Sequence, residues 1–493
     1  MISALGILGV LLLYPAVLFV YNVFLHPLRK YPGPTLAAAT SFPFFWRRLR
    51  GDLVPWYTQL HKQYGSVVRV APNQLSYTTA EAWKDIYGHK TSSGRGNLPR
   101  DLRYYGKPSI SDDSIIHAND LNHSRIRRLV SHAFSDRALS AQTPLVKEHV
   151  ELLVEKIRDV ARAAGGTVDL EQMSNFVAFD VIADLTFGES LGLLKSNAYT
   201  PWVASIFEGF KFGGIVSAIK LQFPLLVPIL QATVLRRGME KRAKHAQFTI
   251  NSVEKRLSRR TDRPDIWTFI LRHNDEKGLA RDEMYSLGSA LMIAGTETTA
   301  TLLSGLFYYL CCSPEKLRKL NDEIRNAFPT VTAMDTTALA RLPYLHAVVM
   351  ETFRLYPPAP QGFPRRVPEG GSTIAGRFVP EKTTVNIPQY AAYHQAHNFY
   401  DPESFRPERW LPEPEQCFAQ DSRDVVEPFG TGPRNCVGKN LAWMEIRLLV
   451  GYLIFHFDFE LSSATKRPWT DQKSWAIYQK GPLLLNVKPR VMS

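Results

Sequence analysis

Residues 429–438 hold a single cysteine in a glycine-rich turn, directly before an apolar helical pattern that starts near Val437. Cys436 lies among Gly432, Arg434 and Gly438, whereas a structural cysteine would have apolar neighbours. Glycines let a flat ligand approach the backbone, and the N-terminus of a helix favours an anionic sulfur. The turn therefore predicts a thiolate presented to a metal ion, and iron is a metal that such a thiolate binds.

The length and composition of the chain favour one large folded domain. With 493 residues the chain has room for two or three average domains, but no Ser/Gly-rich linker interrupts it. Hydrophobic residues make up 45% and charged residues 21%, which excludes a disordered or collagen-like chain. We therefore expect one domain over residues 29–493, behind a membrane anchor at residues 1–28.

The anchor is predicted because residues 2–25 contain no charged side chain. A helix of that length spans roughly 36 Å at about 1.5 Å per residue, which is enough to cross a bilayer. A cleaved signal peptide is the alternative, but the run lacks a basic start and a small-residue cleavage site. Arg29, Lys30 and Arg47 follow the run, so the positive-inside rule predicts a single-pass protein with a cytosolic body. Residues 31–34 are expected to form a stiff turn between anchor and domain.

The cysteine count and the net charge bound the compartment and the partners. Four cysteines are too few for a disulfide scaffold and suit a reducing compartment, and the adjacent Cys311 and Cys312 are expected in the core. The formal net charge of +13 is compatible with nucleic acid, but the basic residues are scattered without a recognisable nucleic-acid module. An acidic protein partner or an anionic membrane surface explains the excess better, and a solvated basic surface without a partner stays open.

Hydrophobic periodicity predicts a mainly α chain with small β sheets. The pattern becomes predominantly helical from about residue 143, and no internal repeat is present. The predicted elements are a hairpin of residues 65–70 and 74–78, helices over 148–164, 236–260 and 282–312, and short strands at 373–379, 384–387 and 483–487.

The cysteine turn resembles the haem-binding signature of the cytochrome P-450 family, F-x-x-G-x-R-x-C-x-G. Its defined positions are Phe429, Gly432, Arg434, Cys436 and Gly438, and a chance match at five fixed positions is improbable, which disfavours an ordinary buried cysteine. The resemblance covers nearly the whole chain and implies the cytochrome P-450 fold behind a single N-terminal transmembrane helix. It also implies that these residues bind haem b, with Cys436 as the axial thiolate of the iron.

Residues 294–299, Ala-Gly-Thr-Glu-Thr-Thr, resemble the oxygen-activation motif of the family and fall inside the predicted helix 282–312. The resemblance implies that Glu297 and Thr298 are catalytic and relay protons toward bound dioxygen. A glycine in mid-helix costs roughly 1 kcal/mol relative to alanine, so Gly295 is expected to open a cleft for oxygen beside a locally loosened helix. The alternative for Thr298 is a hydrogen bond to its own helix backbone.

Glu351 and Arg354 lie three residues apart on one predicted helix face, a spacing that is common and weak by itself. Together with Arg409 they resemble the buried Glu-Arg-Arg triad of the family. Trp410 stands where the family usually has phenylalanine, which keeps an aromatic side chain. The implied role is structural: the triad holds the loop that carries Cys436.

The propionates of haem need cationic or N–H partners near the ring edge. The motif itself offers Arg434. Residues 123–127 resemble the W-x-x-x-R element of the family with His123 in place of tryptophan, which implies His123 and Arg127 as further contacts. Arg365 resembles another propionate contact, with its neighbour Arg366 as the alternative. A solvated charge stays open for each arginine.

The substrate contacts implied by the resemblance are apolar and aromatic, so a lipophilic substrate follows. Residues 202–231 are expected to roof the pocket and dip into the membrane, or else simply to pack in the core. The implied lining comprises residues 104–116, Ala290, Ile293, Ala294, residues 358–363 and residues 475–478.

These features together imply a membrane-anchored haem-thiolate monooxygenase that uses dioxygen and electrons from NADPH. The chain shows no nicotinamide or flavin motif, so a separate NADPH–cytochrome P-450 reductase is expected, with cytochrome b5 as a further electron donor. Residues 26–34, 70–75 and 82–88 resemble filamentous-fungal microsomal members of secondary metabolism. This implies an endoplasmic reticulum membrane protein that oxidises a terpenoid, polyketide or alkaloid.

Two other functions are weighed against monooxygenation. A haem-thiolate isomerase or dehydratase also needs Cys436 but has no use for the relay of Glu297 and Thr298. A membrane haem protein without turnover needs neither the relay nor the complete motif. The presence of both features favours the monooxygenase.

Overall fold

The computed structural model describes residues 13–89, 97–105, 110–111, 113–163, 165–233, 236–274 and 278–490. Most of these residues are helical, and the strands form small sheets, as expected. The helices outside the central bundle are α2 (Thr35–Ala39), α3 (Phe42–Arg50), α4 (Leu53–Tyr64), α5 (Ala80–Tyr87), α6 (Asp120–Ser131), α9 (Leu193–Ser196), α10 (Pro201–Gln222), α11 (Val227–Ala232), α12 (Arg236–Leu257), α13 (Ile266–Leu271), α15 (Pro314–Ala327), α16 (Thr336–Ala340) and α18 (Gln389–Tyr393).

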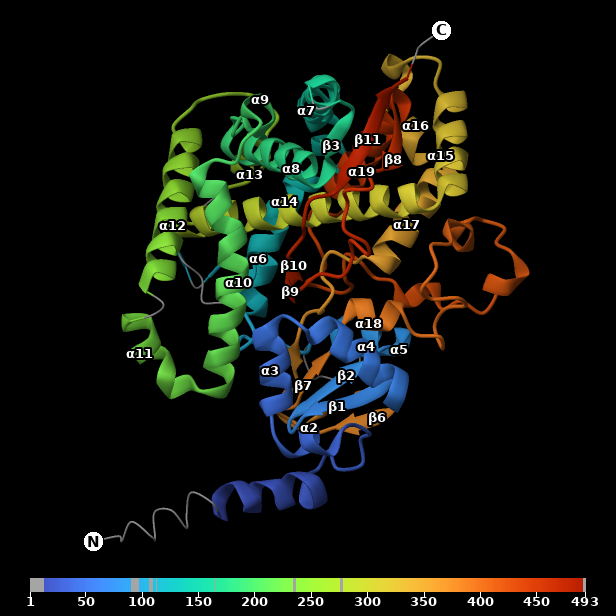
Figure 1. Cartoon of the computed structure of the whole chain (residues 1–493). Coiled ribbons are helices and arrows are strands. Elements are labelled where there is room, and N and C mark those ends of the chain that lie inside the picture. The colour runs from blue at the N-terminus through green and yellow to red at the C-terminus, as the bar shows by residue number, and fades with distance from the viewer. Residues whose placement is uncertain are drawn as a thin grey trace.

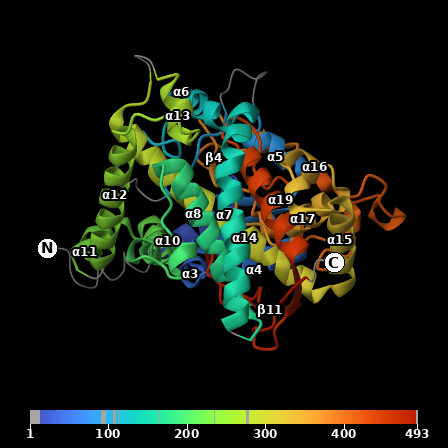
Figure 2. The same cartoon turned by 90° about the horizontal axis from the view of Figure 1, so that it is seen from above.

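The long helix α14 (Arg281–Cys312) crosses the middle of the molecule (Figure 1). Its start is capped where the Glu283 carboxylate accepts a hydrogen bond from the Ala280 N–H at 2.9 Å. α10, α11 and α12 gather on one side of the molecule and α15 and α16 on the other in both views (Figures 1 and 2). The central bundle consists of α14 together with α7 (Asp136–Ala163), α8 (Leu170–Phe187), α17 (Pro343–Leu355) and α19 (Lys439–His456).

Helix α8 packs closely along α14 because small residues bring the two backbones together. A Cβ atom at Gly295 would lie 2.8 Å from Ile182 of α8, so a larger residue there would push the helices apart. Helix α8 is buried around nearly its whole circumference, which is typical of a helix enclosed by neighbours. The predicted loosening of α14 at Gly295 is wrong, because the helix runs unbroken and the glycine is required by packing.

A four-stranded sheet lies at the other end of the molecule with α2 to α5 and α18 around it (Figure 1). Its order is β1 (Val67–Ala71), β2 (Gln74–Tyr77), β7 (Thr384–Asn386) and β4 (Arg365–Arg366), in which β2 and β7 are parallel and the other pairs antiparallel. The remaining strands form a sheet of β3 (Thr167–Asp169), β11 (Leu484–Pro489) and β8 (Phe457–Leu461), and two hairpins, β5 (Ser372–Ile374) with β6 (Arg377–Val379) and β9 (Ser474–Trp475) with β10 (Ile477–Tyr478).

The predicted elements are confirmed where the periodicity was strong. The hairpin of residues 65–78, the helices over 236–260 and 282–312 and the three late strand segments are all present. The helix predicted from residue 148 begins earlier, at Asp136, because Pro144 is accommodated inside it. In the described residues before residue 132, helices α2 to α6 were not predicted, because a helix of one to three turns offers only a short stretch in which to recognise a pattern.

The N-terminal segment ends in an apolar helix at Leu13–Leu25 that lies outside the body of the molecule (Figure 1). Its side chains are exposed, among them Leu13 and Phe24. Residues 1–12 of the predicted anchor lie outside the described residues. Within the described part, the one helix with the length and apolar character to cross a membrane is α14, and most of its surface is buried in the core.

The turn at residues 31–34 belongs to the folded body. The Pro32 carbonyl accepts a hydrogen bond of 2.7 Å from the Arg69 N–H of β1, and the Tyr31 hydroxyl donates one of 3.0 Å to the Phe378 carbonyl. A Cβ atom at Gly33 would lie 2.4 Å from the Arg69 carbonyl oxygen. The predicted stiff turn is therefore held against the four-stranded sheet.

Candidate functional site

The loop before α19 folds back on itself and presents Cys436 at its end. The Cys436 N–H donates to the Phe429 carbonyl at 2.8 Å, and the Asn435 N–H donates to the Gly432 carbonyl at 3.2 Å. Gly432 has φ +74°, and a Cβ atom there would lie 1.9 Å from the carbonyl oxygen of Tyr87. The positive φ and the close contact with the end of α5 are by themselves enough to require glycine at position 432.

The sulfur of Cys436 is accessible although protein surrounds it. The side chain is exposed by area, while burial raises the pKa of the Cys436 thiol more than the Gly438 N–H, Arg127 and Lys439 lower it. The exposed area and the raised pKa agree because the exposed surface of Cys436 faces a space that protein atoms surround. The expected preference for the anion is thus outweighed in the protein alone, and metal coordination would remove the proton.

Arg127 fastens the cysteine loop to α6. Its guanidinium donates to the Asn435 carbonyl oxygen and, at 2.7 Å, to the Asn435 side-chain oxygen. Asn435 directly precedes Cys436. The arginine therefore holds the loop itself, in addition to the propionate contact implied by the sequence.

The Glu-Arg-Arg triad forms as predicted, and all three side chains are fully buried. Arg354 binds both oxygens of Glu351 at 2.8 and 2.9 Å, and Arg409 binds it at 3.2 Å. Trp410 donates its indole N–H to the same carboxylate at 2.8 Å, which phenylalanine cannot do. A buried carboxylate with this many donors is a rigid anchor.

The triad reaches the cysteine loop through Tyr393. Arg354 donates to the Tyr393 carbonyl at 3.0 Å, and the Tyr393 hydroxyl accepts a hydrogen bond of 3.0 Å from the Glu427 N–H. Two residues later, Phe429 packs edge-to-face on Phe353 of α17, with ring centres 5.3 Å apart. A continuous chain of hydrogen bonds and packing contacts therefore connects the triad to the cysteine loop, as its implied structural role requires.

Three arginines come together near this loop, and Arg365 is buried while Arg100 and Arg434 are partly buried. Arg434 comes from the loop, Arg365 from β4, and Arg100 from a segment that pairs with Arg365 in an isolated β-bridge. Arg434 binds Asp120 at 2.7 Å and the Ala118 carbonyl at 2.7 Å. Burial lowers the pKa of Arg100 to about 10 and also lowers that of Arg365.

Each of the three guanidinium groups keeps a buried nitrogen without a hydrogen-bond partner among the described residues. These nitrogen atoms are Nε of Arg100, Nε of Arg365 and Nη1 of Arg434. The hydroxyl oxygen of Tyr105 is a further buried polar atom without a partner among the described residues. Three positive charges face one carboxylate, Asp120, so the cluster has an excess of two positive charges. Buried cations of this kind need anionic partners.

His123 of α6 borders the same cluster and is buried. Burial, with the charges of Arg434, Arg100 and Arg127, lowers the pKa of His123 to about 4, so the ring is neutral at pH 7. A neutral ring still has one N–H to donate. Arg366, the alternative to Arg365, is less buried and contributes its backbone N–H to the Pro99 carbonyl.

These observations test whether the residues fit haem, and they do. Haem carries two propionate groups, and the arginine cluster has two uncompensated charges and unpaired N–H groups. A Cβ atom at Gly438 would lie 3.9 Å from the Cys436 sulfur, so glycine there leaves space beside the sulfur. Arg100 was missed by the sequence because only its pairing with Arg365 reveals it.

One face of α14 stays accessible along the middle of the helix. Ala290, Ala294 and Thr298 follow at intervals of four residues, and Ala294 is exposed although the rest of this stretch is mostly buried. The Thr298 hydroxyl donates to the Ala294 carbonyl at 2.7 Å. The alternative of a backbone hydrogen bond is therefore observed, and its oxygen retains a lone pair that can accept another.

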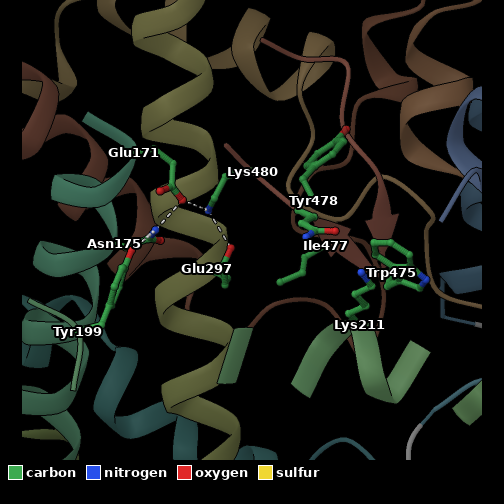
Figure 3. Close-up of a pocket in the computed structure, with 10 residues that line it drawn as sticks. Glu171, Asn175, Tyr199, Lys211, Glu297, Trp475, Ile477, Tyr478 and Lys480 are labelled. Atoms are coloured by element: carbon green, nitrogen blue, oxygen red, sulfur yellow. Dashed lines mark hydrogen bonds and ion pairs between the residues drawn. The ribbon is translucent and has the colours of Figure 1, made fainter. Parts of the chain in front are cut away.

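The side chain of Glu297 is bound to Lys480 (Figure 3), whereas the Thr298 hydroxyl is bound to the Ala294 carbonyl. The Glu297 carboxylate accepts a hydrogen bond of 2.8 Å from Lys480 and one of 3.4 Å from the Thr301 hydroxyl. Lys480 also lies 3.5 Å from Glu171 of α8. The structure thus brings Glu297 into an ion cluster with two residues that the sequence analysis did not single out, since neither belongs to a motif.

A cavity of about 470 Å³ adjoins this ion cluster. Trp475, Ile477 and Tyr478, which the sequence placed in the substrate pocket, line its other side (Figure 3). Lys211 of α10 lies over the Trp475 ring at 5.1 Å. Of the other implied lining segments, residues 106–109 and 112 lie outside the described residues.

Comparisons with known proteins agree with the site. A family model described as Cytochrome P450 matches residues 32–487. The chain is 41% identical to cytochrome P450 monooxygenase astA of Talaromyces wortmannii, over 99% of this chain and 98% of that protein. It is 42% identical to cytochrome P450 monooxygenase FUM2 of Gibberella moniliformis (94% and 98% covered) and 39% identical to averantin hydroxylase of Dothistroma septosporum (98% and 91%).

Proposed function

The chain belongs to the cytochrome P450 family, and from this premise we propose how its own residues serve the reaction. The chain is a haem-thiolate monooxygenase, and its relatives act in fungal secondary metabolism. The observation that carries the proposal is the Cys436 loop, which is tied to α6 by Arg127 and lies beside an arginine cluster with two uncompensated charges.

We propose that the cofactor is haem b and that the Cys436 thiolate would hold its iron. Arg100, Arg365 and Arg434 would bind the propionates, and the neutral ring of His123 would donate a further hydrogen bond. Phe429 and Gly438 would border the ring beside the sulfur, and Gly432 supports the loop through its contact with α5. When bound, haem supplies the activation of dioxygen for oxygen insertion, and the thiolate tunes it.

The protein's own part in the chemistry is to place the substrate and move protons. The accessible face of α14 carries Thr298, whose oxygen can accept a hydrogen bond while its own proton is held by the Ala294 carbonyl. Glu297, one residue earlier, lies at a cavity that connects it to solvent protons. We assign Thr298 and Glu297 to proton delivery from this arrangement.

The electrons are proposed to come from NADPH–cytochrome P-450 reductase, with cytochrome b5 as a second donor. The formal net charge of +13 suits an acidic partner that docks by electrostatic steering. The apolar helix at Leu13–Leu25 supports attachment to the endoplasmic reticulum membrane with the domain in the cytosol. The division into an anchor at residues 1–28 and a domain at residues 29–493 is part of this proposal.

The substrate is proposed to be a lipophilic secondary metabolite of the terpenoid, polyketide or alkaloid classes. One relative is named for hydroxylating averantin, which supports hydroxylation as the reaction type here. The aromatic hairpin of Trp475 and Tyr478 supplies apolar surface near α14. Mapping spectral shifts with a library of such metabolites would identify the compound.

The proposal is tested by Cys436→Ala, with Cys417→Ala as the matched control. Cys417 is exposed and lies outside the loop of residues 429–438, so its removal should leave the enzyme unchanged. Cys436→Ala should lose the red-shifted carbon monoxide band that reports thiolate coordination. A retained band in Cys436→Ala would refute the assignment of the ligand.

A further inference from the structure

Lys480 lies between two carboxylates in the interior of the protein (Figure 3). Its Nζ atom is 2.8 Å from Glu297 of α14 and 3.5 Å from Glu171 of α8. The side chains of Lys480 and Glu297 are each 2% exposed, and that of Glu171 is 14% exposed. The three residues therefore form one buried ion cluster, which we call the Lys480 cluster.

The Lys480 cluster carries one more negative charge than positive charge when both carboxylates are ionised. Burial alone would lower the pKa of Lys480, but Glu297 and Glu171 outweigh it and raise that pKa, so the ammonium stays charged. Burial raises the pKa of Glu171, although Lys480 lowers it. A buried excess charge is costly, and uptake of one proton removes it.

The cavity beside the cluster gives it access to water. Its volume of about 470 Å³ accommodates several waters, and two polar atoms in its lining lack a partner among the described residues. They are Oδ1 of Asn175, whose amide donates to Glu171 at 2.6 Å, and the hydroxyl of Tyr478. Buried groups of this kind normally bind ordered water, which carries protons.

The position of Glu297 on α14 limits how a proton can leave the cluster. Successive residues of a helix point about 100° apart, and Glu297 is turned toward Lys480 and Thr301 while Thr298 is turned toward Ala294. Glu297 must therefore leave Lys480 to reach Thr298. Glu171 lies close enough to keep Lys480 paired when it does so.

We propose that the Lys480 cluster is the proton-loading group of the enzyme, with Lys480 and Glu171 as positioning residues for Glu297. Glu297 takes one proton from cavity water while Lys480 shifts onto Glu171. The neutral Glu297 then turns and gives this proton to the Thr298 oxygen, which releases its own proton toward the accessible face of α14. Glu297 returns to Lys480 as a carboxylate. This inference rests on the proposed function.

The charged and titratable groups around the cluster come from every element that packs on it. Among the described residues, none of these groups is a cation bound to Glu297 in addition to Lys480. They are Asp169 of β3, Tyr199 in the segment before α10, Lys211 of α10, Tyr356 of α17 and Tyr478 of β10.

The test uses Glu171→Gln in the haem-loaded enzyme. Loss of the Glu171 charge leaves Glu297 and Lys480 as a neutral pair with no reason to take up a proton. Glu445, whose pKa burial raises to about 8, should keep its own infrared band in both proteins. A second titrating band of a protonated carboxyl group should be present in the wild-type protein and absent from Glu171→Gln. During NADPH consumption with the reductase and no added substrate, the share of electrons recovered as hydrogen peroxide should rise roughly twofold or more.

Two lysine variants complete the test. Lys480→Met should raise the share of electrons released as peroxide, as Glu171→Gln does. Lys480→Arg keeps the positive charge, so its peroxide share should equal that of the wild type. Lys473→Met is the matched control, since Lys473 is half exposed and pairs with Asp52 at the surface. Its infrared titration and peroxide share should equal those of the wild type.

The carbon monoxide band of the thiolate-bound haem is measured first. It tests the proposed function separately from the role of the Lys480 cluster. If the wild-type protein lacks that band, the proposed function fails. If the band is present, and Glu171→Gln has the wild-type infrared titration and peroxide share, the role of the Lys480 cluster is refuted while the proposed function stands.

Discussion

The Nη2 atom of Arg127 lies 2.7 Å from the side-chain oxygen of Asn435, the residue before Cys436. The same guanidinium also binds the Asn435 carbonyl. A helix that is more than 300 residues away in sequence thereby fixes the loop that presents the sulfur. The geometry of the cysteine loop depends on this contact as much as on the cysteine motif.

Removal of Arg127 should loosen the cysteine loop. A hydrogen bond to a charged group contributes about 1.5–3 kcal/mol, so Arg127→Ala should release haem roughly tenfold faster or more. Transfer of haem to an acceptor protein measures the rate. Arg128→Ala is the matched control because Arg128 is exposed, and equal rates for the two variants would contradict the role of Arg127.

Thr298→Ala should divert reducing equivalents to hydrogen peroxide, because it removes the hydroxyl that we assign to proton delivery. Thr298→Ser keeps the hydroxyl and should retain the coupling of the wild type. The measurement is the ratio of peroxide formed to NADPH consumed. An unchanged ratio in Thr298→Ala would contradict the role of Thr298 in proton delivery. The hydroxyl would then serve only in the hydrogen bond to the Ala294 carbonyl.

Glu445 of α19 predicts a pH dependence of stability. The carboxyl is fully enclosed and touches only the Thr299 hydroxyl, at 3.4 Å, with its other oxygen unpaired among the described residues. Burial raises the pKa of Glu445 to about 8 from 4.5. The folded state therefore binds a proton that the unfolded chain releases between pH 4.5 and 8, so this group's stabilising contribution falls as the pH rises through that range.

Glu445→Gln should remove this dependence, since the amide does not titrate. At pH 9 the variant should be more stable than the wild type by roughly 2–4 kcal/mol, and the two should converge near pH 5. Urea unfolding at the two pH values measures the difference. A constant difference between the proteins at both pH values would show that Glu445 keeps its charge when buried.

Deletion of residues before Arg29 should release the domain from the membrane fraction without loss of haem. The deletion removes the buried Leu28, but it keeps Tyr31 and the hydrogen bonds of the turn at residues 31–34. Cell fractionation and the haem spectrum are the measurements. Secretion of a processed wild-type chain would instead identify the segment as a signal peptide.

Local sequence patterns were sufficient for the main elements of the site. The helix 282–312 and the hairpin of residues 65–78 follow from periodicity, which depends on residues close in the chain. The cysteine loop and the pair of Glu351 and Arg354 likewise lie within short stretches. Short helices such as α4 and α5 escaped prediction because packing against the sheet, more than their own pattern, stabilises them.

The sequence by itself singled out Cys436 as the residue that we propose to bind iron, and it predicted the two arginine partners that Glu351 has in the structure. Only the tertiary structure decided that Trp410 adds a donor to Glu351, that Arg100 joins Arg365 and Arg434, and that Glu297 faces Lys480 instead of Thr298. The physical reason is that a buried charge is satisfied by whichever partner the fold brings near. Lys480 is 183 residues from Glu297 along the chain, a distance over which no local pattern carries information.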